Sequence, residues 1–216
     1  MSIEESDVWE YKDKIIDVIG NSGADIVLGP ELAMGNKNNF VTPREMDYFG
    51  REIISKLWKG KDQIIIPGTA IVSNGKSLRN TAFVLRNEGA LSFVRFDKKS
   101  SDREDEIAEN LGLEYQRGNE KPVVRFRGKD IGIEICRDHG HARLKNSLEG
   151  EVLDMQFILA CNLEGFYPEK TVVRDGGIVA VIDGYEPSVV AYRKKDGNFE
   201  LIKPERETKN YDLVEI

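Results

Sequence analysis

Apolar residues recur at three- and four-residue intervals in two segments, and these intervals are typical of amphipathic helices. In the segment 7–19 the recurring residues are Val8, Tyr11, Ile15, Val18 and Ile19. The second segment opens with Thr42, Pro43 and, three positions after the threonine, Glu45, which together are a helix-start signal. Its apolar face consists of Met46, Phe49, Ile53 and Leu57. The pattern therefore predicts one helix over 7–19 and another that runs from position 43 toward Gly60.

Shorter apolar runs bounded by glycine, proline and asparagine predict strands. They are 26–28, 63–66, 69–72, 80–85, 91–96, 122–127, 131–136, 155–160, 178–182, 188–193 and 199–202. The turn residues at 87–89 and 128–130 predict that the strands on either side of each turn form a hairpin. A short amphipathic helix is expected over 140–149, and the highly charged stretch 100–121 is expected to be loop with some helix. Helix–strand units that bracket hairpins favour a sheet core with helices on its outer face.

The composition and charge of the chain argue against several classes of function. The net charge of −7 argues against nucleic acid or an anionic membrane as the main partner, because both attract basic surfaces. The apolar runs are too short to predict a transmembrane helix, and the acidic first residues do not look like a secretory signal. Two cysteines are too few for a disulfide framework, so we expect a reducing cytoplasm. No linker or repeat divides the 216 residues, so we expect one domain over 1–216.

Three residues that are able to do chemistry follow short apolar runs. Glu31 follows the strand-like run 24–30, Lys98 follows 91–97, and Cys136 ends the alternating run 131–135. Layered α/β proteins place reactive groups at such strand–loop junctions. A buried cysteine is more often a small core residue. Cys136, however, is followed at once by a cation and an acid, a setting that favours the thiolate.

Other interpretations of these residues stay open on the residues alone. Glu31 also fits a solvated loop acid, and Lys98, which precedes Lys99, also fits surface charge. His139 and His141 follow Cys136 closely enough that a Cys–His dyad is an alternative. These are the only two histidines, so little is left for a zinc site. The second cysteine, Cys161, has no charged neighbours and is interpreted as structural.

Taken in order, the three motifs resemble the carbon–nitrogen hydrolase (nitrilase) superfamily. The motifs are Pro30-Glu31, the hairpin from Asn80-Thr81-Ala82 to Phe96-Asp97-Lys98, and Ile135-Cys136 with Asp138. The resemblance covers roughly residues 24–162. It implies an α/β fold of the four-layer αββα type, here shortened at both ends, and a catalytic triad of Glu31, Lys98 and Cys136. Members associate through their helical layers, which implies a homodimer.

The family often has a second active-site glutamate upstream of a glycine. Gly118 fits that glycine, and the candidates for the second acid are Glu109 and Glu114. The implied function is a thiol hydrolase that cleaves a non-peptide C–N bond of a small-molecule amide, carbamoyl compound or nitrile through a thioester, without a metal or an organic cofactor. Alternatives are a catalytically impaired relative that serves as a binding or regulatory module, and a Cys–His enzyme that uses His139 or His141. Specificity is expected in the loops 32–41, 99–121 and 162–176.

Overall fold

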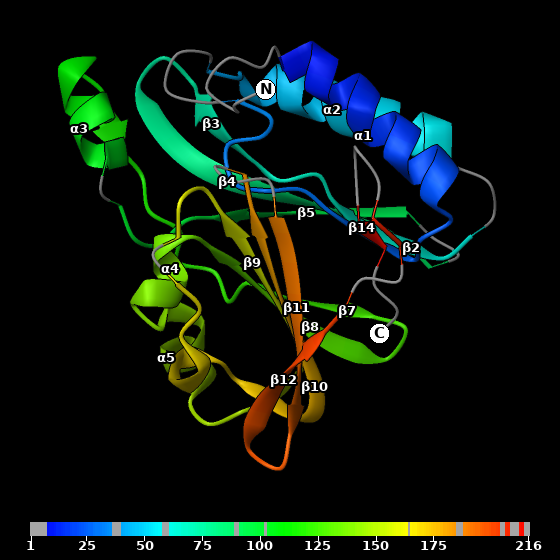
Figure 1. The fold of residues 1–216 in the computed structure, drawn as a ribbon. Helices are drawn as coiled ribbons and strands as arrows, with labels where there is room; N and C mark the ends of the chain where they lie inside the picture. Colours follow the sequence, from blue (N-terminus) through cyan, green and yellow to red (C-terminus); the bar gives the residue numbers. More distant parts are fainter. Residues whose placement is uncertain are drawn as a thin grey trace. The chain divides into compact units, whose positions relative to one another are not determined.

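The protein is a mixed α/β molecule, as the sequence predicts, and it contains two six-stranded sheets (Figure 1). The structure, a computed structural model, describes residues 8–35, 40–57, 61–88, 91–101, 103–163, 165–184, 188–203, 206–207 and 212–213. The chain divides into two compact units, Met1–Glu120 and Lys121–Ile216, and each contains one of the six-stranded sheets. The single domain over 1–216 stays a prediction.

The first unit is built around the long strand β4. Its elements are α1 (Val8–Ser22), β1 (Ile26–Leu28), α2 (Pro43–Leu57), β2 (Gln63–Ile66), β3 (Thr69–Ser73), β4 (Ser77–Asn87), β5 (Leu91–Asp97), α3 (Arg103–Asn110) and β6 (Glu114–Tyr115). The strand order is β1-β2-β4-β3, and β5 and β6 also pair with β4. Strands β4 and β5 are antiparallel with Thr81 opposite Asp97, which confirms the first predicted hairpin.

Helices α1 and α2 lie side by side against the first sheet (Figure 1). The buried residues of this core come from both helices and from β1, β2 and β4; they include Ile15, Val27, Met46, Ile53, Ile65 and Phe83. At the start of α2 the Thr42 N–H donates to Glu45 Oε2 (2.8 Å), and the Glu45 N–H donates to Thr42 Oγ1 (3.2 Å). This reciprocal pair is the capping arrangement that the sequence predicts, and it satisfies two backbone donors that the helix leaves unpaired.

The second unit has a parallel centre flanked by antiparallel strands. Its elements are β7 (Val123–Phe126), β8 (Lys129–Ile135), α4 (Arg137–Gly140), α5 (Arg143–Leu148), β9 (Leu153–Ala160), a 3₁₀ turn (Pro168–Lys170), β10 (Val173–Asp183), β11 (Ser188–Lys195), β12 (Asn198–Ile202), β13 (Arg206–Glu207) and β14 (Asp212–Leu213). The order is β12-β11-β10-β9-β8-β7, while β13 and β14 form a separate pair. Strands β8, β9 and β10 are parallel, and β7 with β8 is the second predicted hairpin.

The predicted helix over 140–149 corresponds to α5, and a further short helix, α4, precedes it. Ala142 lies between them with a φ of 51°, a left-handed backbone conformation that no right-handed helix contains. Helix α5 buries Leu144 and Leu148 in a core that also includes Leu153. This packing places α5 over β8 and β9, next to the end of β8 where the predicted nucleophile lies.

Candidate functional site

Glu31 is buried in the turn that follows β1, with 3% of its surface exposed. Thr69, at the start of β3, fixes this turn from both sides. The Leu32 N–H donates to Thr69 Oγ1 (2.9 Å), and the Thr69 N–H donates to the Pro30 carbonyl oxygen (3.3 Å). Thr69 itself is fully buried. The Glu31 carboxylate is therefore held on a rigid turn inside the first unit rather than solvated, as an ordinary loop acid is.

Lys98 is buried directly after β5, where two backbone hydrogen bonds fix its position. Its N–H donates to the Asn80 carbonyl oxygen (2.8 Å), and its own carbonyl oxygen accepts from the Gly118 N–H (3.1 Å). A Cβ at position 118 would lie 2.0 Å from the Asp97 carbonyl oxygen, so only glycine permits this approach. The glycine that the sequence pattern singled out thus has a local role in supporting Lys98.

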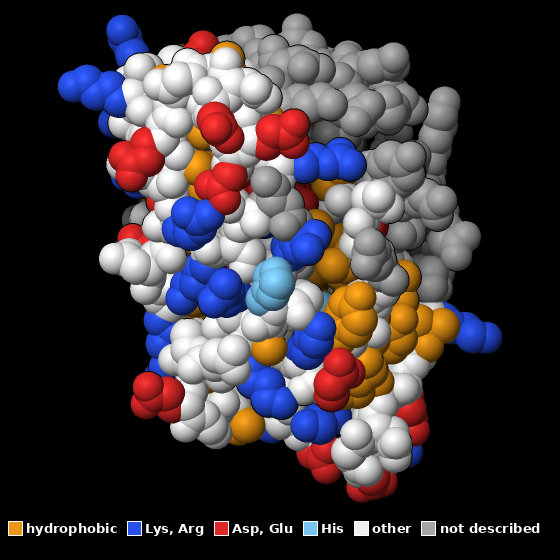
Figure 2. All heavy atoms as spheres, turned by 90° about the vertical axis from the view of Figure 1, so that its left-hand side faces the viewer, with side chains coloured by type: hydrophobic (Ala, Val, Ile, Leu, Met, Phe, Trp, Pro, Cys, Tyr) orange, Lys and Arg blue, Asp and Glu red, His pale blue; other side chains and the backbone are white. Residues whose placement is uncertain are grey.

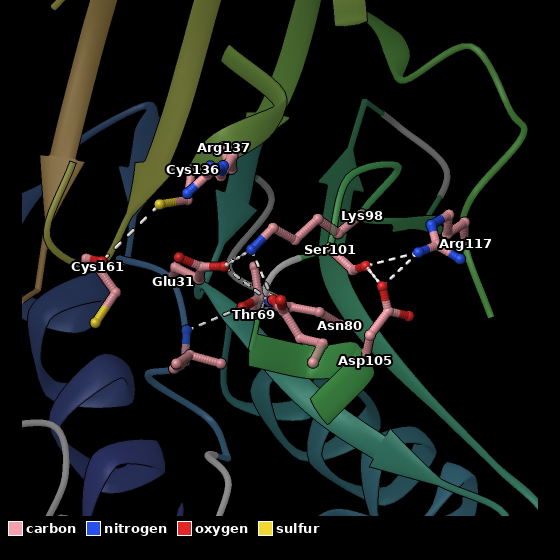
Figure 3. Close-up of polar contacts among 12 residues, drawn as sticks. Glu31, Thr69, Asn80, Lys98, Ser101, Asp105, Arg117, Cys136, Arg137 and Cys161 are labelled. Atoms are coloured by element: carbon pink, nitrogen blue, oxygen red, sulfur yellow. Dashed lines mark hydrogen bonds and ion pairs between the residues drawn. The ribbon is translucent and has the colours of Figure 1, made fainter. Parts of the chain in front are cut away.

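Lys98, Glu31, Glu104 and Asn80 form one buried cluster in the first unit (Figure 3). Lys98 Nζ donates to Glu31 Oε1 (2.9 Å) and to Glu104 Oε1 (2.6 Å). Asn80 Nδ2 donates to the same two oxygens, at 2.8 Å and 3.0 Å. Two carboxylates therefore share one ammonium and one amide, a closed arrangement that fixes all four side chains.

The two carboxylates determine the charge state of Lys98. Burial alone acts to lower the pKa of the lysine, but the nearby charges of Glu31 and Glu104 outweigh it and raise that pKa above its ordinary value. Lys98 is therefore a fixed ammonium at physiological pH. A fixed buried cation is suited to stabilise negative charge that develops on a substrate oxygen.

Glu104, on α3, is the acid beside Lys98 that the sequence analysis missed. The two predicted candidates for a second acid, Glu109 on α3 and Glu114 on β6, are both exposed. A signal for Glu104 was present in the sequence. Ala108 and Ile107 lie four and three residues after it, so Glu104 shares the apolar face of α3. An acid on the apolar face of a short helix needs a buried partner, and here Lys98 provides it.

Cys136 lies in the second unit, at the junction between β8 and α4. Its backbone has a φ of 46° and a ψ of −104°, which is a strained conformation for a residue other than glycine. The Cys136 N–H donates to the Leu159 carbonyl oxygen (2.8 Å), and its own carbonyl oxygen accepts from the His139 N–H (3.0 Å). The half-buried thiol lies 3.9 Å from the Cys161 carbonyl oxygen (Figure 3). A half-buried cysteine on a strained strand–helix turn is a candidate nucleophile.

Basic side chains surround this turn on the surface of the second unit. Arg137, Arg143 and Lys145 are exposed within nine residues of Cys136, and Figure 2 shows Lys and Arg side chains gathered over α4 and α5. Although the whole chain carries a net charge of −7, this face is locally basic.

The two histidines differ in their surroundings. His139 is fully buried; its Nδ1 lies 2.8 Å from Glu134 Oε2, and its Nε2 accepts from the Tyr167 N–H (3.4 Å). His141 is exposed, and its Nε2 accepts from Arg137 Nε (3.4 Å). Both ring nitrogens of His139 thus have partners other than the Cys136 thiol, which speaks against His139 as the base of a Cys–His dyad.

The described residues present two sets of reactive groups, a carboxylate–lysine–amide cluster in the first unit and a strained cysteine in the second. Within the described ranges, no group of three or more His, Cys, Asp or Glu side chains is placed to hold a metal ion. Nor does the described part of the chain contain a helix long and apolar enough to cross a membrane.

No protein-family model and no curated protein sequence matches the chain. Solved structures do. An amidase of the nitrilase superfamily from Nesterenkonia AN1 matches with a TM-score of 0.63 at 15% identity, over 89% of this chain and 80% of that one. Another structure of that amidase, with the acetamide moiety of fluoroacetamide added covalently at its active-site cysteine, matches with a TM-score of 0.63 at 14% identity, over 89% and 79%.

A second kind of protein shares the fold. The glutamine-dependent NAD+ synthetase from Acinetobacter baumannii matches with a TM-score of 0.62 at 14% identity, over 93% of this chain but 41% of the synthetase. The present chain therefore corresponds to less than half of that enzyme. Both kinds of neighbour agree with the two sheets and helices described above. The chain has the fold of the carbon–nitrogen hydrolase (nitrilase) superfamily.

Proposed function

We propose that this protein is a thiol hydrolase that cleaves the C–N bond of a small-molecule amide, with Cys136 as nucleophile, Glu31 as general base and Lys98 as the cation for the developing oxyanion. The observation that carries the proposal is the buried cluster in which Lys98 Nζ lies between Glu31 and Glu104. Burying two carboxylates and an ammonium is costly, and such arrangements are common where groups must be tuned for catalysis. The fold shared with amidases that have an active-site cysteine adds support.

The first half of the reaction forms a thioester. Glu31 accepts the thiol proton of Cys136 as the sulfur attacks the amide carbon, and the negative charge that develops on the oxygen meets the Lys98 ammonium. The protonated Glu31 then gives its proton to the amide nitrogen as the C–N bond breaks. An amine or ammonia leaves, and the acyl group stays on sulfur.

The second half releases the acid. Glu31 removes a proton from a water molecule as the water oxygen attacks the thioester carbon, and Lys98 again stabilises the oxyanion. The C–S bond breaks and the proton returns to sulfur, so amide plus water gives carboxylic acid plus amine. This chemistry requires Cys136 Sγ, Lys98 Nζ and the Glu31 carboxylate to lie within hydrogen-bond reach of one substrate carbonyl group.

Glu104 and Asn80 complete this proposal as groups that hold the catalytic pair. A single carboxylate beside Lys98 has to serve both as the lysine's counter-charge and as the base. With Glu104 as a second acceptor for the ammonium, Glu31 is not the sole counter-charge of Lys98. Asn80 donates to both acids and so limits their mutual repulsion.

The test is turnover of a panel of small amides, N-carbamoyl compounds and nitriles, followed by ammonia release, with intact-protein mass spectrometry to detect acylated Cys136. We expect ammonia release from at least one simple amide, an acyl adduct in the wild-type protein, and neither signal in Cys136→Ala. Equal ammonia release by wild type and Cys136→Ala would reject the proposal. Binding of amides without turnover by the wild-type protein would instead favour an impaired relative that serves as a binding module.

A further inference from the structure

A side-chain pair in the second unit spans Cys136 along the chain. Glu134 lies two residues before the cysteine on β8, and His139 lies three residues after it in α4. Glu134 Oε2 and His139 Nδ1 are 2.8 Å apart, and the two residues expose 1% and 0% of their surface. Because a carboxylate only accepts, His139 Nδ1 carries the hydrogen that it donates to Glu134. The bond between Glu134 and His139 therefore links residues on either side of Cys136, whose backbone is strained.

Both oxygens of the Glu134 carboxylate accept further hydrogen bonds. Gln156 Nε2, from β9, donates to Glu134 Oε2 (2.7 Å), and the Leu144 N–H at the start of α5 donates to Glu134 Oε1 (3.0 Å). Beyond the pair, Gln156 Oε1 accepts from the Val172 N–H (3.0 Å). With the Tyr167 N–H donating to His139 Nε2, the network joins β8, β9, α4, α5 and the segment 167–172.

The backbone of Cys136 explains why such a network is present at this place. A non-glycine residue at a φ of 46° and a ψ of −104° relaxes to an ordinary conformation unless its surroundings prevent it. Two backbone hydrogen bonds hold Cys136 itself, and one of them, from the His139 N–H, ties its carbonyl oxygen to α4. The side-chain bond from Glu134 to His139 adds a second tie, which joins β8 to α4 directly.

Packing alone does not account for these polar residues. Apolar side chains of similar volume fill a core without the cost of burying a carboxylate. Completely satisfied buried networks, in contrast, rigidify and specify one local arrangement. Here every polar side-chain atom of Glu134, His139 and Gln156 has a partner within the second unit.

We propose that Glu134 and His139 act as a clasp that positions the Cys136 thiol. This inference rests on the proposed function of Cys136 as the nucleophile. Neither residue is assigned contact with the substrate; both are positioning residues that act through the backbone of the turn. Gln156 orients the Glu134 carboxylate within the clasp.

The test compares two substitutions of His139 in a Cys161→Ala background, so that Cys136 is the single thiol. In His139→Asn the side-chain nitrogen takes the place of Nδ1, so the donation to Glu134 is kept while the acceptor for Tyr167 is lost. In His139→Leu both are lost while an apolar side chain fills the space. Folded fraction is measured by circular dichroism, kcat and KM on the amide with the highest turnover, and Cys136 reactivity by the rate of iodoacetamide alkylation as a function of pH.

We expect His139→Leu to lower kcat ~10-fold or more with little change in KM, on the scale of a misplaced reacting group, and His139→Asn to retain most of kcat. Alkylation of Cys136 should slow in His139→Leu and not in His139→Asn. This second readout needs no turnover, so it stays decisive even if the hydrolase proposal fails. Glu134→Met, which keeps the length of the side chain and removes both carboxylate acceptors, serves if His139→Leu does not fold, and the same losses are expected.

The clasp is refuted if folded His139→Leu matches wild type in both kcat and alkylation rate while only its thermal stability falls. It is also refuted if kcat and the alkylation rate fall as far in His139→Asn as in His139→Leu, because the bond to Glu134 would then be irrelevant. For Glu134→Met, unchanged alkylation of the folded protein counts against the clasp in the same way.

Discussion

Replacing Lys98 by methionine is the sharpest single perturbation of the buried cluster. The substitution removes the ammonium while keeping most of the side-chain volume, so Glu31 and Glu104 are left with Asn80 as their shared donor. Their side chains are 4% and 9% exposed, so water cannot replace the lost cation. Removing one partner of a buried ion pair costs about 3–5 kcal/mol of stability. For a chain of this size, that corresponds to a fall in melting temperature of roughly 10 °C or more.

The pH dependence of this loss identifies its cause. In the wild type the pKa of Lys98 is raised, so the stability that its ammonium contributes is fully present below the ordinary pKa of lysine. This stability is lost only as the pH rises through the higher folded value. That contribution is therefore constant between pH 5 and 8. In the variant, two buried carboxylates without a cation bind protons more readily in the folded state than in the unfolded state. The deficit should thus be largest near about pH 8 and shrink toward about pH 5.

The assay is urea denaturation of wild type, Lys98→Met and the matched control Lys99→Met at both pH values. Lys99 is the neighbouring half-buried lysine, and its replacement should cost less than about 1 kcal/mol. Adding Glu104→Gln to Lys98→Met should restore part of the stability and none of the activity, because it removes one unpaired charge. A Lys98→Met protein as stable as Lys99→Met at pH 8 would refute this account of the cluster.

Three further predictions concern catalysis and folding. Cys136→Ala should abolish amide turnover measured by ammonia release, while Cys161→Ala should stay close to wild type, because only Cys136 has the strained turn. Asn80→Ala removes two donors from buried acids and should cost about 1–3 kcal/mol in urea denaturation, with a lower kcat. Thr42→Ala should cost about 1 kcal/mol through loss of the helix cap. The backbone N–H and the hydroxyl of Thr42 both lower the pKa of Glu45, and alanine removes only the hydroxyl. The part of the Thr42→Ala deficit that comes from the hydroxyl bond to Glu45 should therefore shrink as the pH falls through the lowered value, in acid titrations followed by circular dichroism.

Local sequence signals were sufficient for much of the fold. The start of α2 follows from Thr42 and Glu45, which interact across three residues, and the first hairpin follows from alternation on either side of a glycine turn. The positions of Glu31 and Lys98 after β1 and β5 were predicted for the same reason, since each strand ends where its apolar run ends. Such signals depend on neighbours within a few positions, which are visible in one sequence.

The contacts that complete the site could not be predicted from the sequence, because they join segments that are distant along the chain. Glu104 is six residues from Lys98, but Glu31, which shares Lys98 and Asn80 with it, lies far away along the chain. The break between α4 and α5 depends on a left-handed alanine at position 142, a residue type with high helix propensity. The tie from Gln156 to Glu134 spans 22 positions. Periodicity places Glu104 on the apolar face of α3, but it does not predict the partner of Glu104, the break at Ala142 or the bond from Gln156.

The most direct test of the hydrolase account is an experimental structure of the protein alkylated by iodoacetamide, which leaves an S–CH2–CO–NH2 group on Cys136. We predict that the carbonyl oxygen of this group lies within about 3 Å of Lys98 Nζ, with the Glu31 carboxylate beside the sulfur. An adduct whose carbonyl oxygen lies remote from Lys98, with the cluster of Glu31 and Glu104 facing elsewhere, would contradict the central claim.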